Sequence, residues 1–133
     1  MGLTTAMTSS ASVTIVAPDG VYGKWIRTHN AAIKINEHEP ELLKDMESML
    51  KRLAPPDAAY FHNNFYVRTV NMEEEECPNG HSHCQHLFLG ASETIPVQDG
   101  QMLLGKWQSI FLVELDHARR RLVLVQTMGV SAG

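Results

Sequence analysis

The chain has only two cysteines, Cys77 and Cys84, among its 133 residues. Small secreted domains that rely on disulfides carry several pairs, so a disulfide framework is excluded and reduced thiols are expected. The first residues also lack the basic head and continuous apolar stretch of a secretory signal. These absences predict a cytoplasmic protein in which residues 1–11 are a flexible N-terminus.

Long apolar runs and an excess of basic charge are missing as well. The longest apolar runs, such as residues 110–113, fall far short of the roughly 18 residues that cross a bilayer. The net charge is -4, and Lys and Arg form no stripe apart from Arg119, Arg120 and Arg121. We therefore expect neither a membrane nor a nucleic-acid partner. The apolar share of 44% fits one globular domain, which we place at residues 12–133.

The clearest periodic pattern lies at residues 40–53. Apolar side chains recur there with the spacing of one helical stripe, formed by Leu42, Leu43, Met46, Met49, Leu50 and Leu53. Pro40 suits a first helical turn, and Pro55 and Pro56 prevent continuation. The sequence therefore predicts one main helix over residues 40–53.

Strands are predicted on both sides of this helix. Residues 31–36 alternate apolar and polar side chains, and residues 12–16 and 24–28 flank a turn signal at Pro18, Asp19 and Gly20. A short helix over residues 82–89 should end at Gly90, followed by strands at residues 93–97, 101–104, 107–115 and 122–128 and a tight turn at Asp99 and Gly100. The last two strands are apolar on both faces. A second β layer or another subunit must therefore cover them.

The long polar segment 54–80 is expected to be an ordered functional loop. It leads into a segment dense in zinc-type ligands, namely Cys77, His81, His83, Cys84 and His86. Their spacing is not that of a zinc finger, and one short segment does not normally wrap a tetrahedral ion. We expect instead that one or two of these histidines converge with His62 and a group at the end of the 31–37 strand. The alternative is that His62, His81 and His83 are hydrogen-bonding loop residues.

Acidic and amide side chains near the main helix are the second set of candidates. Asp45 lies on the flank of the apolar stripe, where a carboxylate either meets water or enters a pocket as a base or a partner that orients a histidine. Asn36 and Glu37 end a predicted strand, a place where functional side chains gather, and a turn role is an equal alternative for Asn36. Glu114, in an otherwise apolar strand, needs a partner or a hydrated cavity, the alternative being an edge position.

Many separated short motifs then occur in one order along the chain. They are residues 31–37 (AAIKINE), 39–40 (EP) with Asp45, 60–63 (YFHN), 79–83 (NGHSH), 89–92 (LGAS), 95–97 (IPV), 104–108 (LGKWQ), 110–114 (IFLVE), and Asp116 with Arg119. In this order and spacing the chain resembles the YjbQ-like family from about Thr28 to Gly129.

The resemblance implies an α+β domain with two packed, mostly antiparallel β layers, in the manner of a β-sandwich, assembled as a homotrimer. It also implies a pocket near the subunit boundaries whose histidines are able to hold a metal, zinc being the expected ion. On this basis His62 and His83 are the expected metal residues, with His81 and His29 as further candidates. Asn36, Glu37 and Asp45 match the family's recurring polar and acidic positions and are the expected catalytic residues.

One family position differs in this chain: Thr28 stands where the family usually has a histidine, and His29 follows it. In a strand, a shift of one residue turns a side chain to the opposite face unless a bulge restores it.

The family resemblance also implies a weak, secondary thiamine-phosphate synthase activity. That reaction requires a clamp for the departing pyrophosphate, but no glycine-rich phosphate loop is present. The clamp would be a metal, Lys106, Arg68 or an arginine of a neighbouring subunit. The alternative function is a non-catalytic trimer that binds a small molecule, phosphorylated or not, or a small anion in the same pocket. A third interpretation treats the histidines as hydrogen-bonding residues of the subunit interface.

Overall fold

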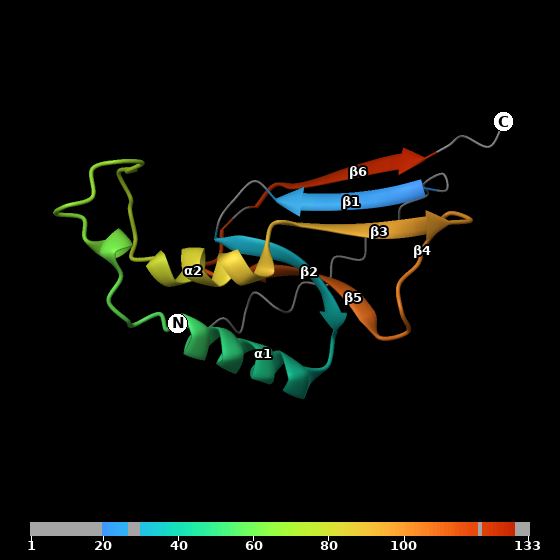
Figure 1. Ribbon diagram of the computed structural model, residues 1–133, viewed down its shortest axis with the longest axis horizontal. Coiled ribbons are helices and arrows are strands. Elements are labelled where there is room, and N and C mark those ends of the chain that lie inside the picture. Colours follow the sequence, from blue (N-terminus) through green and yellow to red (C-terminus); the bar gives the residue numbers. More distant parts are fainter. Residues whose placement is uncertain (1–19, 27–29, 120, 130–133) are drawn as a thin grey trace.

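The computed structural model describes residues 30–119 and 121–129 with their side chains, and residues 20–26 as backbone. Within these ranges the chain forms two antiparallel sheets and two α-helices (Figure 1). The larger sheet has the order β4-β3-β1-β6, from Gln101–Met102, Ser92–Gln98, Gly20–Ile26 and Val123–Gly129. The smaller sheet pairs β2 (Ala31–Glu37) with β5 (Gln108–Glu114). This arrangement confirms the predicted α+β class with two antiparallel sheets.

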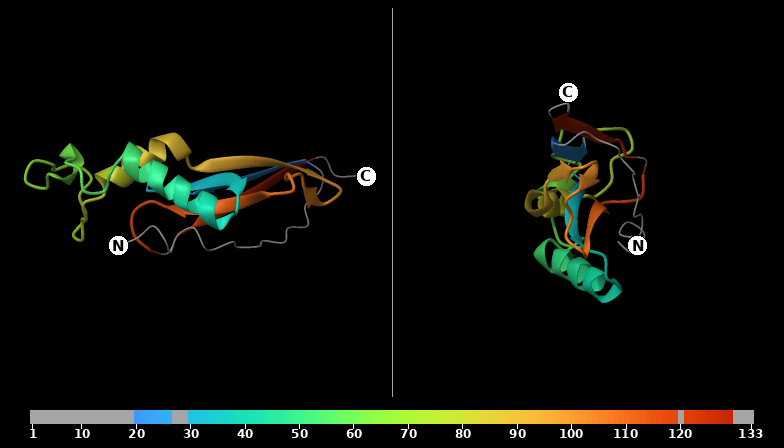
Figure 2. Two further views of the ribbon diagram at one scale, coloured as in Figure 1. Left: turned by 90° about the horizontal axis from the view of Figure 1, so that it is seen from below. Right: turned by 90° about the vertical axis from the view of Figure 1, so that its right-hand side faces the viewer.

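The smaller sheet is buried on both faces. On one face, Ala31 and Ile33 of β2 pack with side chains of β5 and with Val123 of β6. On the other face, Ala32 and the β5 residues Phe111 and Val113 pack against helix α1 (Pro40–Leu53) through Leu43, Met46 and Leu50. Figure 2 shows α1 at one side of the molecule and the β1–β6 pair at the opposite side. The alternation along β2 predicts one buried face, but both faces are buried at residues 31–33, because the small apolar Ala32 stands on the face that packs against α1.

Helix α1 has the bounds that its periodicity predicts. The side chain of Glu39 caps it, accepting hydrogen bonds from the backbone N–H groups of Glu41 at 3.0 Å and Leu42 at 2.7 Å. These two bonds, from Glu41 first, lower the pKa of the Glu39 carboxyl below its usual value. Lys51 and Arg52 occupy the last turn, where positive charge complements the helix dipole.

The turn between β3 and β4 follows the prediction, but β4 is shorter than expected. Asp99 has φ 50° and Gly100 has φ 73°, the left-handed conformation that a two-residue type I′ hairpin requires. The expected strand at residues 101–104 contains only Gln101–Met102, because the amide of Leu104 already bonds back to the carbonyl of Met102. The strand therefore ends in a local turn.

The N-terminal prediction needs correction. Strand β1 begins at Gly20, inside the turn expected at residues 18–20, and runs to Ile26, whereas a strand was expected at residues 24–28. It lies in the middle of the larger sheet, paired with β3 on one side and β6 on the other. The predicted strand at 12–16, the N-terminal segment 1–11 and His29 lie outside the described residues.

Strand β6 is an edge strand with exposed apolar side chains. Its Leu124, Val125 and Met128 are 42%, 40% and 61% exposed. The sequence predicts that both apolar faces of this strand are covered. The described part of this chain does not cover them. Among the described residues, no helix is long and apolar enough to cross a membrane.

Candidate functional site

A projecting arm, residues 55–79, joins α1 to helix α2 (Gly80–Leu89) and carries the short helix η2 (Phe61–Asn63) (Figure 1, green). Two hydrogen bonds hold the base of the arm in place. The Tyr60 hydroxyl donates to the Pro55 carbonyl at 2.8 Å, and the backbone N–H of Gly80 donates to Asn63 Oδ1 at 2.9 Å. These bonds agree with the prediction of an ordered loop.

The arm and the start of α2 together form an imidazole–guanidinium cluster, composed of His62, Arg68 and Glu76 of the arm and His83 of α2. The rings of His62 and His83 meet edge to face, with centroids 4.5 Å apart. Arg68 Nη1 lies 2.6 Å from His62 Nε2 and 3.2 Å from His62 Nδ1, and its Nη2 pairs with Glu76 at 2.7 Å. Both Arg68 and Glu76 are largely shielded, with side chains 13% and 15% exposed. The cluster therefore holds a positive group against His62, whose ring packs on that of His83.

Glu76 is held in its ionised form within this cluster. A hydrogen bond from the backbone N–H of Glu73, at 3.0 Å, is the main reason that its pKa lies below the usual value, and Arg68 lowers the pKa further. The Arg68–Glu76 pair therefore consists of two full charges at neutral pH. An anionic ligand would compete with Glu76 for the guanidinium.

Close packing at the start of α2 positions this cluster. A Cβ atom added at Gly80 would lie 2.6 Å from Cβ and 2.8 Å from Cγ of Tyr60, two residues before His62. Only glycine allows η2 and α2 to approach this closely.

Gly80→Ala should therefore destabilise the protein, although alanine normally stabilises a helix by about 1 kcal/mol relative to glycine. We expect the free energy of unfolding to fall by about 1–3 kcal/mol, the usual cost of overpacking. Urea denaturation measures this. Gly105→Ala is the control, because its Cβ would meet only the flexible Gln108 side chain, from 3.3 Å. An unchanged or increased stability for Gly80→Ala would contradict the packing described.

His81 is separated from the two clustered histidines. Two residues along a helix correspond to a rotation of about 200°, so His81 and His83 lie on different sides of α2. His81 is buried, 9% exposed, and its Nδ1 has no hydrogen-bond partner among the described residues. Buried Asn79 Oδ1 is likewise without a partner in the described part of the chain.

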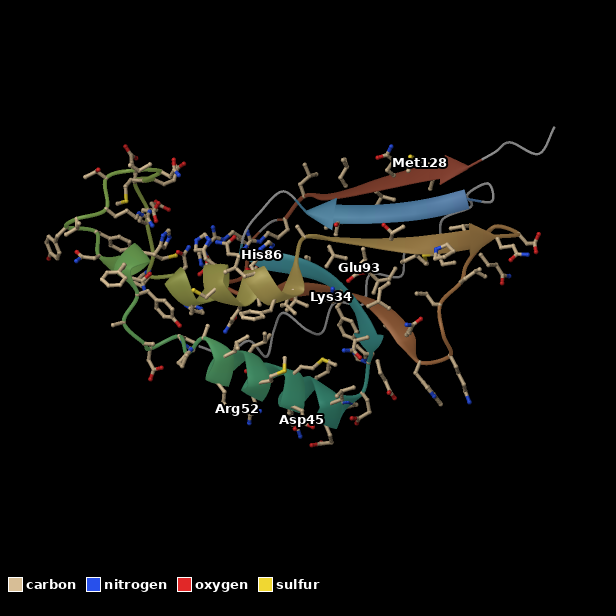
Figure 3. The ribbon with its side chains drawn as sticks, viewed as in Figure 1. Lys34, Asp45, Arg52, His86, Glu93 and Met128 are labelled. Atoms are coloured by element: carbon tan, nitrogen blue, oxygen red, sulfur yellow. The ribbon has the colours of Figure 1, made fainter. Side chains whose placement is uncertain are left out.

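Asn36, Glu37 and Asp45 lie away from the imidazole–guanidinium cluster within one chain. Asn36 and Glu37 end β2, next to the start of α1, whereas η2 and the start of α2 lie beyond the far end of α1, on the side of the arm (Figure 1). Asn36 Oδ1 accepts a hydrogen bond from the Glu37 amide at 2.8 Å. Asp45 is exposed on α1 (Figure 3). Asn36 also lines a small apolar cavity of about 120 Å³ between α1 and the smaller sheet.

The sequence did not reveal a second polar group, formed where the arm meets the loop after β5. Cys77 Sγ lies 3.8 Å from Asp116 Oδ1 and 3.8 Å from His117 Nδ1. Arg119 bonds to the Asp116 carboxylate and lies 2.8 Å from His117 Nδ1, and Asn30 Nδ2 donates to Asp116 at 3.2 Å. Burial, and then the charge of Asp116, raise the pKa of the Cys77 thiol.

Beside this group lies a buried ion pair. Arg121 binds both carboxylate oxygens of Glu114, with Nε to Oε2 at 2.7 Å and Nη2 to Oε1 at 2.5 Å. The expectation that Glu114 needs a partner is therefore confirmed. Arg121 Nη1 also donates to Asn30 Oδ1 at 3.2 Å, which links the beginnings of β2 and β6 to the end of β5.

The imidazole–guanidinium cluster, as described, does not fit the zinc ion that the resemblance implies. Both ring nitrogens of His62 already face the Arg68 guanidinium, so a zinc ion would lie against a fixed positive charge. Among the described residues, three potential ligand atoms come within 4.8 Å of one another at Cys77, Asp116 and His117. His62, His81 and His83 do not form such a group there.

Comparison with known proteins gives the family. The family model described as UPF0047 protein YjbQ-like matches residues 3–130. The chain belongs to this family. A UPF0047 protein of Methanothermobacter thermautotrophicus is 39% identical over 125 residues, which cover 94% of this chain and 80% of that protein. The UPF0047 protein YugU of Bacillus subtilis is 30% identical over 100 residues, covering 74% and 67% of the two chains.

Solved structures of the YjbQ-like fold agree. A hypothetical protein of Aeropyrum pernix superposes with a TM-score of 0.73 and 30% identity, covering 86% of this chain and 78% of its own. A YjbQ/UPF0047 protein of Clostridium acetobutylicum gives a TM-score of 0.70 at 27% identity, covering 89% and 79%. The family resemblance seen in the sequence is thus confirmed. The names of these relatives give no reaction.

Proposed function

We propose that this YjbQ-like protein binds a small phosphorylated molecule at the imidazole–guanidinium cluster. The observation that carries the proposal is the contact between Arg68 Nη1 and the ring of His62, with His83 beside it. The Arg68 guanidinium is a charged donor suited to phosphate oxygens, and a ligand that drew it away from His62 would free an imidazole nitrogen beside it as a further donor. In a chain of net charge -4, this local concentration of donors is not a consequence of overall charge.

Glu76 sets the selectivity of the proposed site. A ligand phosphate would replace the Glu76 carboxylate on Arg68 Nη2, which is now 2.7 Å away. Because the exchange replaces one carboxylate with a group of higher charge, pyrophosphate or a phosphate monoester is favoured over a carboxylate ligand. Because Arg68 is largely shielded, solvent screens its attraction to a ligand phosphate less than it would at a surface arginine.

A secondary thiamine-phosphate synthase activity would use the same clamp. In that reaction a thiazole nitrogen forms a bond to a pyrimidine methylene carbon, and the bond from this carbon to the pyrophosphate oxygen breaks. Arg68 and the two histidines would stabilise the charge that develops on the departing pyrophosphate. Lys106, the other basic clamp candidate of this chain, lies over the Trp107 ring instead, 4.4 Å from its centroid.

Assembly as a homotrimer is part of the proposal. The arm exposes Phe61 and Tyr66 almost fully, at 99% and 100%, with Val67 at 74% and Val70 at 70%. So much apolar surface on one projecting segment favours contact with a neighbouring copy. A neighbour could then bring its own Asn36, Glu37 and Asp45 toward the cluster, from which they are separated within one chain.

The test of the proposed site is calorimetric titration with pyrophosphate. We expect Arg68→Ala to weaken binding by at least about tenfold, because a charge-assisted bond to a shielded guanidinium contributes about 1.5–3 kcal/mol. The control is Arg52→Ala on exposed α1, which should leave binding within about twofold. Equal affinity of parent and Arg68→Ala would refute the assignment. The non-catalytic alternative predicts binding without turnover in a synthase assay with thiazole phosphate and pyrimidine pyrophosphate.

A further inference from the structure

A second site lies outside the imidazole–guanidinium cluster and involves a residue that matches no motif of the family resemblance. Cys77 ends the acidic part of the arm, and Asp116 and His117 follow strand β5. The fold thus brings three different ligand types, a thiol, a carboxylate and an imidazole, from two separate segments to one place. This is the N, O and S ligand chemistry that zinc accepts and that magnesium and calcium do not prefer.

The spacing of these atoms matches a tetrahedral zinc ion. Zinc bonds of about 2.3 Å to sulfur and about 2.0–2.1 Å to nitrogen or oxygen require about 3.6 Å between sulfur and either other ligand, and about 3.3 Å between nitrogen and oxygen. The structure has Cys77 Sγ at 3.8 Å from His117 Nδ1 and at 3.9 Å from Asp116 Oδ2. His117 Nδ1 lies 3.2 Å from Asp116 Oδ2. No ligand would need to move by more than a few tenths of an ångström.

The surroundings also fit a cation. The Asp116 side chain is only 6% exposed, and Asn30 Nδ2 donates to its Oδ2 at 3.2 Å, as partners of metal-binding carboxylates do. A positive group is already present, because Arg119 Nη2 bonds to Asp116 and approaches His117 Nδ1 at 2.8 Å. The Arg119 side chain is 37% exposed, so it can leave toward solvent without unfolding the neighbouring strands.

We propose that Cys77, Asp116 and His117 form a zinc site in which the Arg119 guanidinium takes the position of the metal until zinc displaces it. On binding, the Cys77 thiol loses its proton to solvent and becomes a thiolate ligand, while Arg119 moves away from Asp116 and His117. The fourth coordination position is then open to water or to a ligand. This site is independent of the proposed phosphate site, although Cys77 follows Glu76 directly.

Because Arg119 and zinc would compete for Asp116 and His117, the proposal predicts that loss of a ligand weakens zinc binding and that loss of Arg119 tightens it. The full chain, without a histidine tag, is titrated with Zn²⁺ in competition with a chromophoric chelator, and with Co²⁺ as a spectroscopic probe. We expect one ion per chain, and a near-ultraviolet sulfur-to-cobalt charge-transfer band. Cys77→Ser and His117→Ala should each weaken zinc binding by at least about tenfold, and Cys77→Ser should abolish the band. Arg119→Gln should instead tighten binding, by about tenfold.

Matched variants separate this site from other thiols and imidazoles. Cys84→Ser and His83→Ala should leave the affinity for zinc within about twofold and keep the charge-transfer band. The proposal is overturned if Cys77→Ser binds zinc like the parent, if Arg119→Gln weakens binding, or if the band disappears with Cys84→Ser. Because Cys77→Ser and Arg119→Gln change partly exposed side chains, the folded protein should survive both. Pyrophosphate binding, measured on the same variants, reports the other site separately.

Discussion

Arg121→Met should lower the free energy of unfolding by about 3–5 kcal/mol at pH 7, as removal of one partner of a buried ion pair does. The side chains of Arg121 and Glu114 are only 9% and 10% exposed, and two parallel hydrogen bonds join them. Without the guanidinium, the Glu114 carboxylate stays in the interior with the Asp116 amide, at 3.2 Å, as a remaining donor. Urea denaturation followed by circular dichroism measures the loss.

Two further variants test the reason for that loss. Arg52→Met removes an arginine from the exposed face of α1 and should change stability by less than about 0.5 kcal/mol. Glu114→Leu combined with Arg121→Met removes both charges together, and should recover most of the lost stability. If Arg121→Met costs no more than Arg52→Met, the pair is not buried in solution. If the double variant is as unstable as the single one, shape rather than charge is responsible.

Local signals in the sequence were sufficient for most of the secondary structure. The stripe from Leu42 to Leu53, bounded by Pro40 and by Pro55 and Pro56, gives α1 its observed bounds. The alternation at residues 31–36 predicts β2 to within one residue. The bounds of β1 differ from the prediction because they depend on pairing with distant segments of the chain. The strand extends back to Gly20 because β3 and β6 supply partners on both sides.

The candidate site was only partly predictable, because its residues meet through contacts between distant segments of the chain. His62 and His83, 21 positions apart, meet because Gly80 allows η2 and α2 to pack closely. In the sequence, only the family resemblance indicated that these two histidines share a pocket. Arg68 was one of several clamp candidates, and the structure places it on His62. Cys77 and Asp116, 39 positions apart, meet through the path of the arm and of β5, and no local pattern records that path.

Gln85→Glu is the second substitution with a large expected effect. Gln85 is fully buried, and its Nε2 donates to the carbonyl groups of Leu50 at 3.1 Å and Ala54 at 3.0 Å, which joins α2 to the end of α1. The glutamate has the same shape, but a carboxylate cannot donate to these carbonyls and is costly to bury. We expect a loss of about 3 kcal/mol or more in the free energy of unfolding at pH 8.

This loss should depend on pH with a sign that identifies its cause. Burial raises the pKa of the new carboxyl in the folded protein above its unfolded value of about 4.3. The folded variant therefore binds more protons than the unfolded one, so its deficit relative to the parent is smallest below about pH 4.3, where the protonated carboxyl keeps one donor for the two carbonyls, and grows as the pH rises. Gln98→Glu, on an exposed position of β3, should show no such dependence. A deficit in Gln85→Glu that stays the same from pH 4 to pH 8 would mean that the side chain reaches water, and that α2 is not anchored to α1 through this contact.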